Sequence, residues 1–204
     1  YLTSGGLHGV GISVVNALSA NLEIEVVRNH NVFRQSFSRG LTTSLLKTGG
    51  NVKRKSGTKV TFSPDPQIFG ENKCFKPSKL LKMVRSKAYL FSGVEINWNC
   101  AEQCLEKDEK TPRTARFHFP GGLVDYLEES LRSYQMYSPM PFSGKINFAE
   151  KFEASTVGSV EWAINWTPQR DGFISSYCNT IPTSEGGTHE IGFWTAILKG
   201  LKSF

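Results

Sequence analysis

The sequence lacks any long apolar run. No stretch approaches the roughly 20 apolar residues that a membrane-spanning helix needs, and no signal peptide opens the chain. Internal repeats and low-complexity tracts are also absent. Its 204 residues, 39% of them hydrophobic and 21% charged, are typical of a globular protein with one or two cores. We therefore expect a cytoplasmic protein that does not associate with membranes.

Cysteine is scarce, and the four cysteines are scattered over positions 74, 100, 104 and 178. None of them has the C-x-x-C spacing of a zinc site, and no histidine lies near Cys100 and Cys104 to complete one. We interpret them as reduced thiols and expect no metal site within this chain.

Acidic residues are also in deficit, with 18 Asp and Glu against 24 Lys and Arg. The resulting formal net charge of +6 agrees with a polyanionic partner. The chain begins with Tyr1 rather than with Met, so we expect it to be a segment of a longer protein.

Glycine is concentrated near the start, where it occupies four of the eight positions 4–11. Glycine lets backbone N–H groups approach a ligand closely, and Val10, Val14 and Leu18 follow at helical spacing. N–H groups at the start of a helix attract anions such as phosphate. This glycine-rich segment matches neither the P-loop pattern nor the dinucleotide-binding fingerprint, the two common phosphate-binding motifs. The alternative is an ordinary junction between a loop and a helix.

Alternating patterns predict an antiparallel hairpin made of strands 22–28 and 32–37, with a turn at 29–31. His30 is expected to be an exposed turn residue. A basic turn at 53–55 leads into a strand at 57–62, and we interpret this turn as solvated charge.

Further along the chain, the patterns predict a helix over 77–91, a strand over 93–98, a loop or hairpin tip over 100–114 and a helix over 121–132. The first of these helices has an apolar stripe of Leu80, Leu81, Val84, Ala88 and Phe91. Lys79, Lys82 and Lys87 lie off the stripe and are interpreted as solvated, with DNA contact as the alternative.

Two prolines in Ser138-Pro-Met-Pro141 mark the best candidate for a domain boundary. Strands are expected at 144–148, 160–166 and 173–178. A final helix, with Thr188 as its N-cap, is expected to bury Ile191, Trp194, Leu198 and Leu201. The glycine pair before it predicts a connecting loop, with a second anion site as the alternative.

Gly-Gly-Leu-His-Gly-Val-Gly at 5–11, followed by Ser-Val-Val-Asn-Ala-Leu-Ser at 13–19, resembles the ATP lid of type II DNA topoisomerase B subunits. These belong to an ATPase superfamily shared with histidine kinases and mismatch-repair proteins. The resemblance implies that backbone amides in this lid surround the ATP phosphates and that Tyr1 approaches the adenine. The implied ATP-binding residues of the lid are Tyr1, Gly6, Leu7, His8, Gly9, Val10 and Gly11.

Two later segments resemble the same family. Gly57-Thr58-x-Val60-x-Phe62 is similar to its third ATP-site motif, which implies that the Thr58 hydroxyl holds the adenine through water and that Arg34 lies at the pocket mouth. Glu185-Gly-Gly-Thr-His-Glu190 resembles a hallmark of the transducer domain. Tyr177 to Thr183 resembles the topoisomerase IV branch more than the gyrase branch.

The resemblance implies an α+β fold in two parts. Residues 1–137 would form the back half of a GHKL-type (Bergerat) ATPase α/β sandwich, and residues 138–204 the first part of a transducer like ribosomal protein S5. Such a protein uses ATP and Mg²⁺ to close a homodimeric gate, while an A-type partner subunit cleaves DNA and a second duplex passes through.

The family's catalytic glutamate, its Mg²⁺-holding asparagine, its adenine-reading aspartate and its Gln-Thr-Lys loop are not in this chain. We therefore expect no catalytic residue here, Mg²⁺ ligands outside these residues, and no ATP hydrolysis by the chain alone. We also expect the sheet of residues 22–62 to be partly uncovered. The alternative function is a non-catalytic module that binds or couples to DNA.

Overall fold

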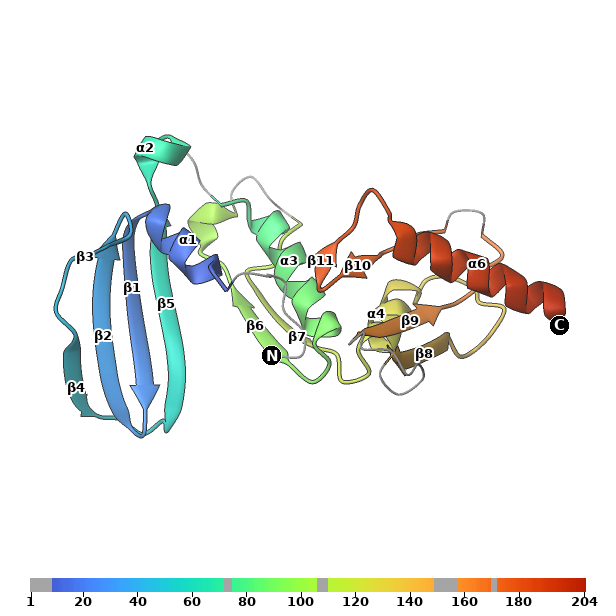
Figure 1. The fold of residues 1–204 in the computed structure, drawn as a ribbon, viewed down its shortest axis with the longest axis horizontal. Helices are drawn as coiled ribbons and strands as arrows, with labels where there is room; N and C mark the ends of the chain where they lie inside the picture. The colour runs from blue at the N-terminus through green and yellow to red at the C-terminus, as the bar shows by residue number, and fades with distance from the viewer. Residues whose placement is uncertain (1–8, 72–74, 106–109, 149–157, 170–171) are drawn as a thin grey trace. The chain divides into compact units, whose positions relative to one another are not determined.

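The computed structural model describes residues 9–71, 75–105, 110–148, 158–169 and 172–204. The chain forms two compact units, Tyr1–Cys74 and Phe75–Phe204, and both contain helices and strands (Figure 1). This confirms the α+β class. The expected boundary after residue 137 lies within the second unit, and as a boundary between functional domains it stays a prediction.

The first unit is an antiparallel sheet with a short helix at each end of its chain. Its sheet has the order β3-β2-β1-β5, and β4 also pairs with β2. The predicted hairpin is present, because Asn29 and His30 adopt positive φ angles of 49° and 66°, the combination that a tight two-residue hairpin turn needs. The elements are α1 (Gly11–Ala17), β1 (Ser19–Arg28), β2 (Asn31–Ser38), β3 (Leu41–Thr42), β4 (Lys47–Asn51), β5 (Ser56–Pro64) and α2 (Pro66–Phe69).

The register of this sheet separates an apolar face from a polar face. Cross-strand partners point to the same side of a sheet, and successive residues of a strand point to opposite sides. The partners Leu22, Phe37 and Phe62 therefore share the apolar face, whereas Glu25 and its partners lie on the other. Leu22 is only 2% exposed, but Phe62 is 43% exposed, so the apolar face is partly uncovered, as expected.

The second unit contains three two-stranded antiparallel pairs, β6–β7, β8–β9 and β10–β11. Helix α3 contacts β6, β7 and α4, and α4 also contacts β9. The elements are α3 (Pro77–Leu90), β6 (Glu95–Asn99), a 3₁₀ turn (Glu102–Cys104), β7 (Thr114–His118), α4 (Leu123–Ser130), β8 (Phe142–Asn147), β9 (Ser159–Ile164), β10 (Tyr177–Cys178), β11 (Ile181–Pro182) and α6 (Thr188–Ser203).

Tyr89 is at the centre of the core of this unit, together with Ala88 and Phe119. Its ring stacks on Tyr126 with 3.9 Å between ring centroids, and its hydroxyl hydrogen-bonds the hydroxyl of Tyr177. Burial, followed by the bond to Tyr177, raises the pKa of Tyr89. The apolar-stripe prediction missed this residue because tyrosine is often only partly buried.

Several local predictions were wrong. Only Tyr177 and Cys178 of the expected strand 173–178 are β-structure. The expected loop or hairpin tip over 100–114 agrees with the structure, because these residues lie between the antiparallel strands β6 and β7, and only Thr114 belongs to β7. Gly187, not Thr188, is the N-cap of α6. Lys87 is not solvated, because its ammonium donates to the carbonyl oxygen of Thr180 at 2.7 Å.

The stripe of α6 is also not buried within this chain. Ile191 is 67% exposed, and the other three predicted stripe residues, Trp194, Leu198 and Leu201, are exposed as well. The spacing predicted the helix correctly, because periodicity follows from backbone geometry. Periodicity does not show whether a partner surface covers the stripe.

Candidate functional site

Three of the predicted lid residues lie in the described part of the chain, at the start of α1. Gly9 has a φ of +66° and no heavy atom within 4 Å of the position where a Cβ would be. Val10 is the N-cap of α1 and is exposed, and Gly11 is the first helical residue. Tyr1, Gly6, Leu7 and His8 lie outside the described residues. The glycine-rich segment therefore leads into a helix, as the spacing predicted.

Thr58 and Arg34 belong to strands of the same sheet but lie on opposite faces. Thr58 pairs with Val26, which places it on the apolar face. Arg34 pairs with Glu25, which places it on the polar face. The structure does not bring these two predicted site residues together on one face.

Glu25 is held between two arginines on the polar face. Its carboxylate contacts Arg34 and Arg54, each at 2.7 Å. The hydrogen bond from Arg34, followed by the positive charges of Arg34, Arg54 and Lys59, lowers the pKa of Glu25 against the opposing effect of desolvation. The Arg34 guanidinium is thus already paired, although its side chain remains 54% exposed.

An ion pair between the half-exposed Arg39 and the buried Asp65 fixes the junction between α1 and the sheet, and the sequence did not reveal it. Asp65 is 1% exposed, and its Oδ2 accepts a 2.5 Å bond from Arg39 Nε while its Oδ1 accepts a 3.2 Å bond from Arg39 Nη2. Oδ1 also caps α2 by accepting from the N–H of Gln67 at 3.0 Å. Asp65 followed by Pro66 was a recognisable helix-start signal, but its arginine partner is 26 residues away in the chain.

Backbone bonds converge on the same junction. The N–H of Asp65 donates to Leu18 O at 2.9 Å, the N–H of Arg39 to Ser19 O at 2.8 Å, and the N–H of Gly40 to Asn16 O at 3.1 Å. The end of α1 is therefore tied both to the β2–β3 turn and to the end of β5. This helix directly follows the segment predicted to be the lid, and the junction holds the C-terminal end of the helix against the sheet.

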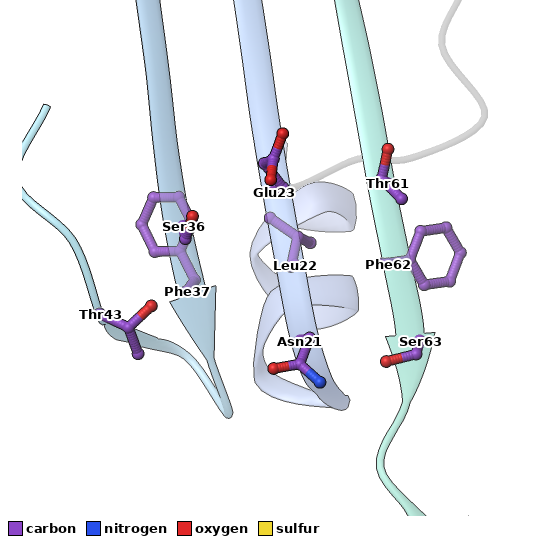
Figure 2. A pocket seen from close by; sticks show the side chains of 9 residues that line it. All are labelled: Asn21, Leu22, Glu23, Ser36, Phe37, Thr43, Thr61, Phe62 and Ser63. Carbon is purple, nitrogen blue, oxygen red and sulfur yellow. The ribbon is translucent and has the colours of Figure 1, made fainter. Parts of the chain in front are cut away.

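A shallow hollow of about 340 Å³ lies at the α1 end of the sheet. Figure 2 shows Glu23, Ser36 and Thr61 beside one another on three adjacent strands, in agreement with their pairing in the register. Its lining also includes Leu22, Phe37 and Phe62. The negative charge of Glu23 repels a phosphate, so the hollow is a poor phosphate site. Sequence reasoning predicted no site here.

The described residues contain no cluster of three or more His, Cys, Asp or Glu side chains that would hold a metal ion. Cys104 and Cys178 are exposed free thiols. No helix in the described ranges combines the length and apolar character needed to cross a membrane.

The segment before α6 is organised by its own polar side chains. Ser176 Oγ lies 2.7 Å from Thr183 Oγ1 and donates to Glu190 Oε2 at 2.9 Å, and Thr183 Oγ1 lies 3.2 Å from His189 Nε2. A Cβ added to Gly186 would lie 3.5 Å from the Glu190 carboxylate. A fixed carboxylate against the glycine pair favours the connecting-loop interpretation over a second anion site.

Comparison with known proteins identifies relatives over the whole chain. Residues 122–204 match the family model described as DNA gyrase B. The chain is 52% identical over 204 residues to the B subunit of DNA topoisomerase 4 from Bartonella bacilliformis, and 49% identical over 208 residues to the corresponding protein of Caulobacter vibrioides. Both alignments cover 100% of this chain and 29% of the relative.

The fold has relatives among solved structures. The 43K ATPase domain of Thermus thermophilus gyrase B, solved in complex with an aminocoumarin, superposes with a TM-score of 0.75 and 34% identity. The superposition covers 96% of this chain and 50% of that structure. The chain therefore spans less than a third of its curated relatives and half of this structural neighbour.

Over its whole length the chain is similar to B subunits of type II DNA topoisomerases, and its fold is similar to that of a gyrase B ATPase domain. Within that class, the curated relatives are B subunits of topoisomerase IV. The relatives thus favour topoisomerase IV over gyrase, as the segment 177–183 predicted.

Proposed function

We propose that this chain is part of the ATP-operated gate of a type II DNA topoisomerase of the topoisomerase IV kind. The observation that carries the proposal is the 52% identity to a topoisomerase IV B subunit along all 204 residues. The likeness to a gyrase B ATPase domain supports ATP as the nucleotide. DNA, an A-type subunit and a second copy of the B subunit are the proposed partners.

In this proposal, residues 1–137 complete a GHKL-type ATPase domain and residues 138–204 begin a transducer domain. The proline-rich connector at 138–141 supports that boundary. The polar network around Thr183 and Glu190 would give the transducer a rigid loop before α6. The apolar face of the sheet, with Val60 and Phe62 still 40% and 43% exposed, has room for the rest of the ATPase domain.

The proposed nucleotide-binding residues are the lid residues Tyr1, Gly6, Leu7, His8, Gly9, Val10 and Gly11, with Thr58 on the sheet and Arg34 near the pocket mouth. The geometry of Gly9 fits a lid that surrounds phosphates, because its positive φ and its open Cβ position leave the backbone N–H groups accessible. Thr58 fits as well, because its exposed hydroxyl lies on the uncovered apolar face.

ATP bound with Mg²⁺ would supply the free energy for the movement of the gate, through transfer of its terminal phosphoryl group to water. The residues of this chain would bind and orient the phosphates but provide no general base. We therefore propose that the 204 residues alone hydrolyse no ATP. Turnover above a buffer blank that disappears when His8 is replaced would contradict this.

The proposal is tested in the complete B subunit together with its A-type partner. Gly9→Ala forces an L-residue to a φ of +66°, which costs about 1–2 kcal/mol. We expect the affinity for a non-hydrolysable ATP analogue to fall about 5- to 30-fold, and ATP-dependent separation of linked DNA circles to fall with it. Gly50→Ala is the control, because Gly50 also has open space but lies in β4. A complete B subunit that supports no ATP-dependent strand passage would overturn the proposal.

A further inference from the structure

The positive charge of the chain is concentrated in its first unit. Residues 1–74 contain nine Lys and Arg against four Asp and Glu, a net charge of +5, whereas residues 75–204 contain fifteen against fourteen, a net charge of +1. This distribution is not needed to bind one nucleotide at the lid. The excess of positive charge indicates that the first unit binds an anion larger than a nucleotide.

The register aligns part of this charge in a row across the polar face of the sheet. Lys47 on β4 pairs with Arg34 on β2, Arg34 pairs with Glu25 on β1, and Glu25 pairs with Lys59 on β5. Neighbouring strands lie about 4.8 Å apart, so the row is about 14 Å long. Glu25 is the one carboxylate in the row, and Arg34 and Arg54 share it.

The basic turn at the end of the sheet extends this row. It is tied to the hairpin by bonds from Val52 N to His30 O at 2.8 Å and from His30 N to Lys55 O at 3.2 Å. The Arg54 guanidinium covers Gly57 and reaches Glu25 on the polar face. The turn is thus held against the sheet, which lowers the entropy lost when a ligand binds.

The ammonium groups on this surface are available to a ligand. Over residues 9–71, the structure gives no ion pair within 4 Å to Lys47, Lys53, Lys55 or Lys59, and all four are exposed. We define the basic face as these four lysines together with Arg34 and Arg54. The prediction that the turn is merely solvated charge did not take account of this row.

We propose that the basic face binds the phosphate backbone of duplex DNA, on the side of the sheet opposite to Thr58. Lysines spread over a flat sheet neutralise phosphates without reading bases. Protein partners are anchored instead by aromatic or apolar side chains that the interface buries. The apolar pair on this face, Val27 and Val32, is already buried at 2% and 6% exposure and offers no such anchor. The choice of DNA rests on the proposed function, whereas the location of the face rests on the charges alone.

The test measures binding of a labelled duplex of about 20 base pairs to the 204-residue chain by fluorescence anisotropy, without nucleotide. The variant Lys47→Gln/Lys53→Gln/Lys59→Gln removes three exposed charges and leaves the Arg34–Glu25–Arg54 contacts intact. The matched control, Lys79→Gln/Lys82→Gln/Lys202→Gln, removes three exposed charges from the second unit. Circular dichroism checks that both variants keep the fold.

We expect the basic-face variant to lower DNA affinity at least about tenfold and to reduce the slope of log K against log salt by about 2–3. The control should change affinity less than about threefold. Equal losses in both variants, or no loss in the first, would overturn the proposal. Poly-glutamate that binds as tightly as DNA, with the same loss in the variant, would overturn the assignment to nucleic acid. Because no nucleotide is present, failure here is distinct from failure of the strand-passage test.

Discussion

At the scale of single residues, Asp65 shows how one carboxylate joins several elements. It accepts hydrogen bonds from the Arg39 side chain and from the Gln67 backbone, and its own N–H bonds to the end of α1. The hydrogen bond from Arg39, followed by that from Gln67, lowers the pKa of Asp65 although burial opposes this. The charged form is therefore favoured in the folded state.

We expect Asp65→Asn to be less stable than the wild type above about pH 5 and to lose this difference in acid. A carboxyl group whose pKa is lowered on folding stabilises the protein above its unfolded pKa of about 3.9, and this stabilisation disappears as pH falls through the folded pKa. Thermal midpoints of both proteins between about pH 3 and pH 7 would show it. A difference that stayed constant across that range would mean that the charge of Asp65 is not what stabilises the junction.

At the scale of elements, the hairpins of the second unit depend on where glycine permits close packing. Gly144 on β8 is the direct partner of Trp162 on β9, and the indole ring occupies the space that a Cβ at position 144 would need. Gly200 in α6 is different, because nothing lies within 4 Å of its Cβ position. The same substitution should therefore have opposite effects in the two elements.

Gly144→Ala should displace the Trp162 indole and lower the free energy of unfolding by about 1–3 kcal/mol, as overpacking does. Gly200→Ala should raise it by about 0.5–1 kcal/mol, because alanine loses less backbone entropy in a helix. Urea titrations followed by tryptophan fluorescence measure both changes. Destabilisation by both substitutions would show that α6 is covered at position 200 in solution.

At the scale of the whole molecule, the two units differ in how they are stabilised. The second unit has an aromatic core around Tyr89. The first unit buries Leu22, Val27 and Val32 of its sheet, while Val60 and Phe62 of the same sheet stay exposed. An apolar sheet face that stays partly uncovered contributes less to stability than a covered one, so we expect the first unit to unfold at lower denaturant concentration.

All four tryptophans, at 98, 162, 166 and 194, lie in the second unit. Tryptophan fluorescence therefore reports on that unit, whereas far-ultraviolet circular dichroism also reports on the sheet of the first. We expect the dichroism signal to begin to change at lower urea concentration than the fluorescence signal, since separate units need not unfold together. Coincident transitions would show that the 204 residues unfold as one cooperative body.

The sequence alone determined the class of fold, the hairpin at 29–31, the helices beginning near residues 11, 77, 123 and 188, and the likeness to topoisomerase B subunits. These properties follow from local periodicity, turn chemistry and contiguous motifs, which a single stretch of chain contains in full. Only the tertiary structure revealed the Arg39–Asp65 pair, the bond from Lys87 to Thr180 and the row of charges across four strands. Each of these joins residues that are far apart in the chain, and their meeting depends on strand register and packing. For the same reason the sequence could not show that Arg34 and Thr58 face opposite sides of the sheet, or that the stripe of α6 lies uncovered in this chain.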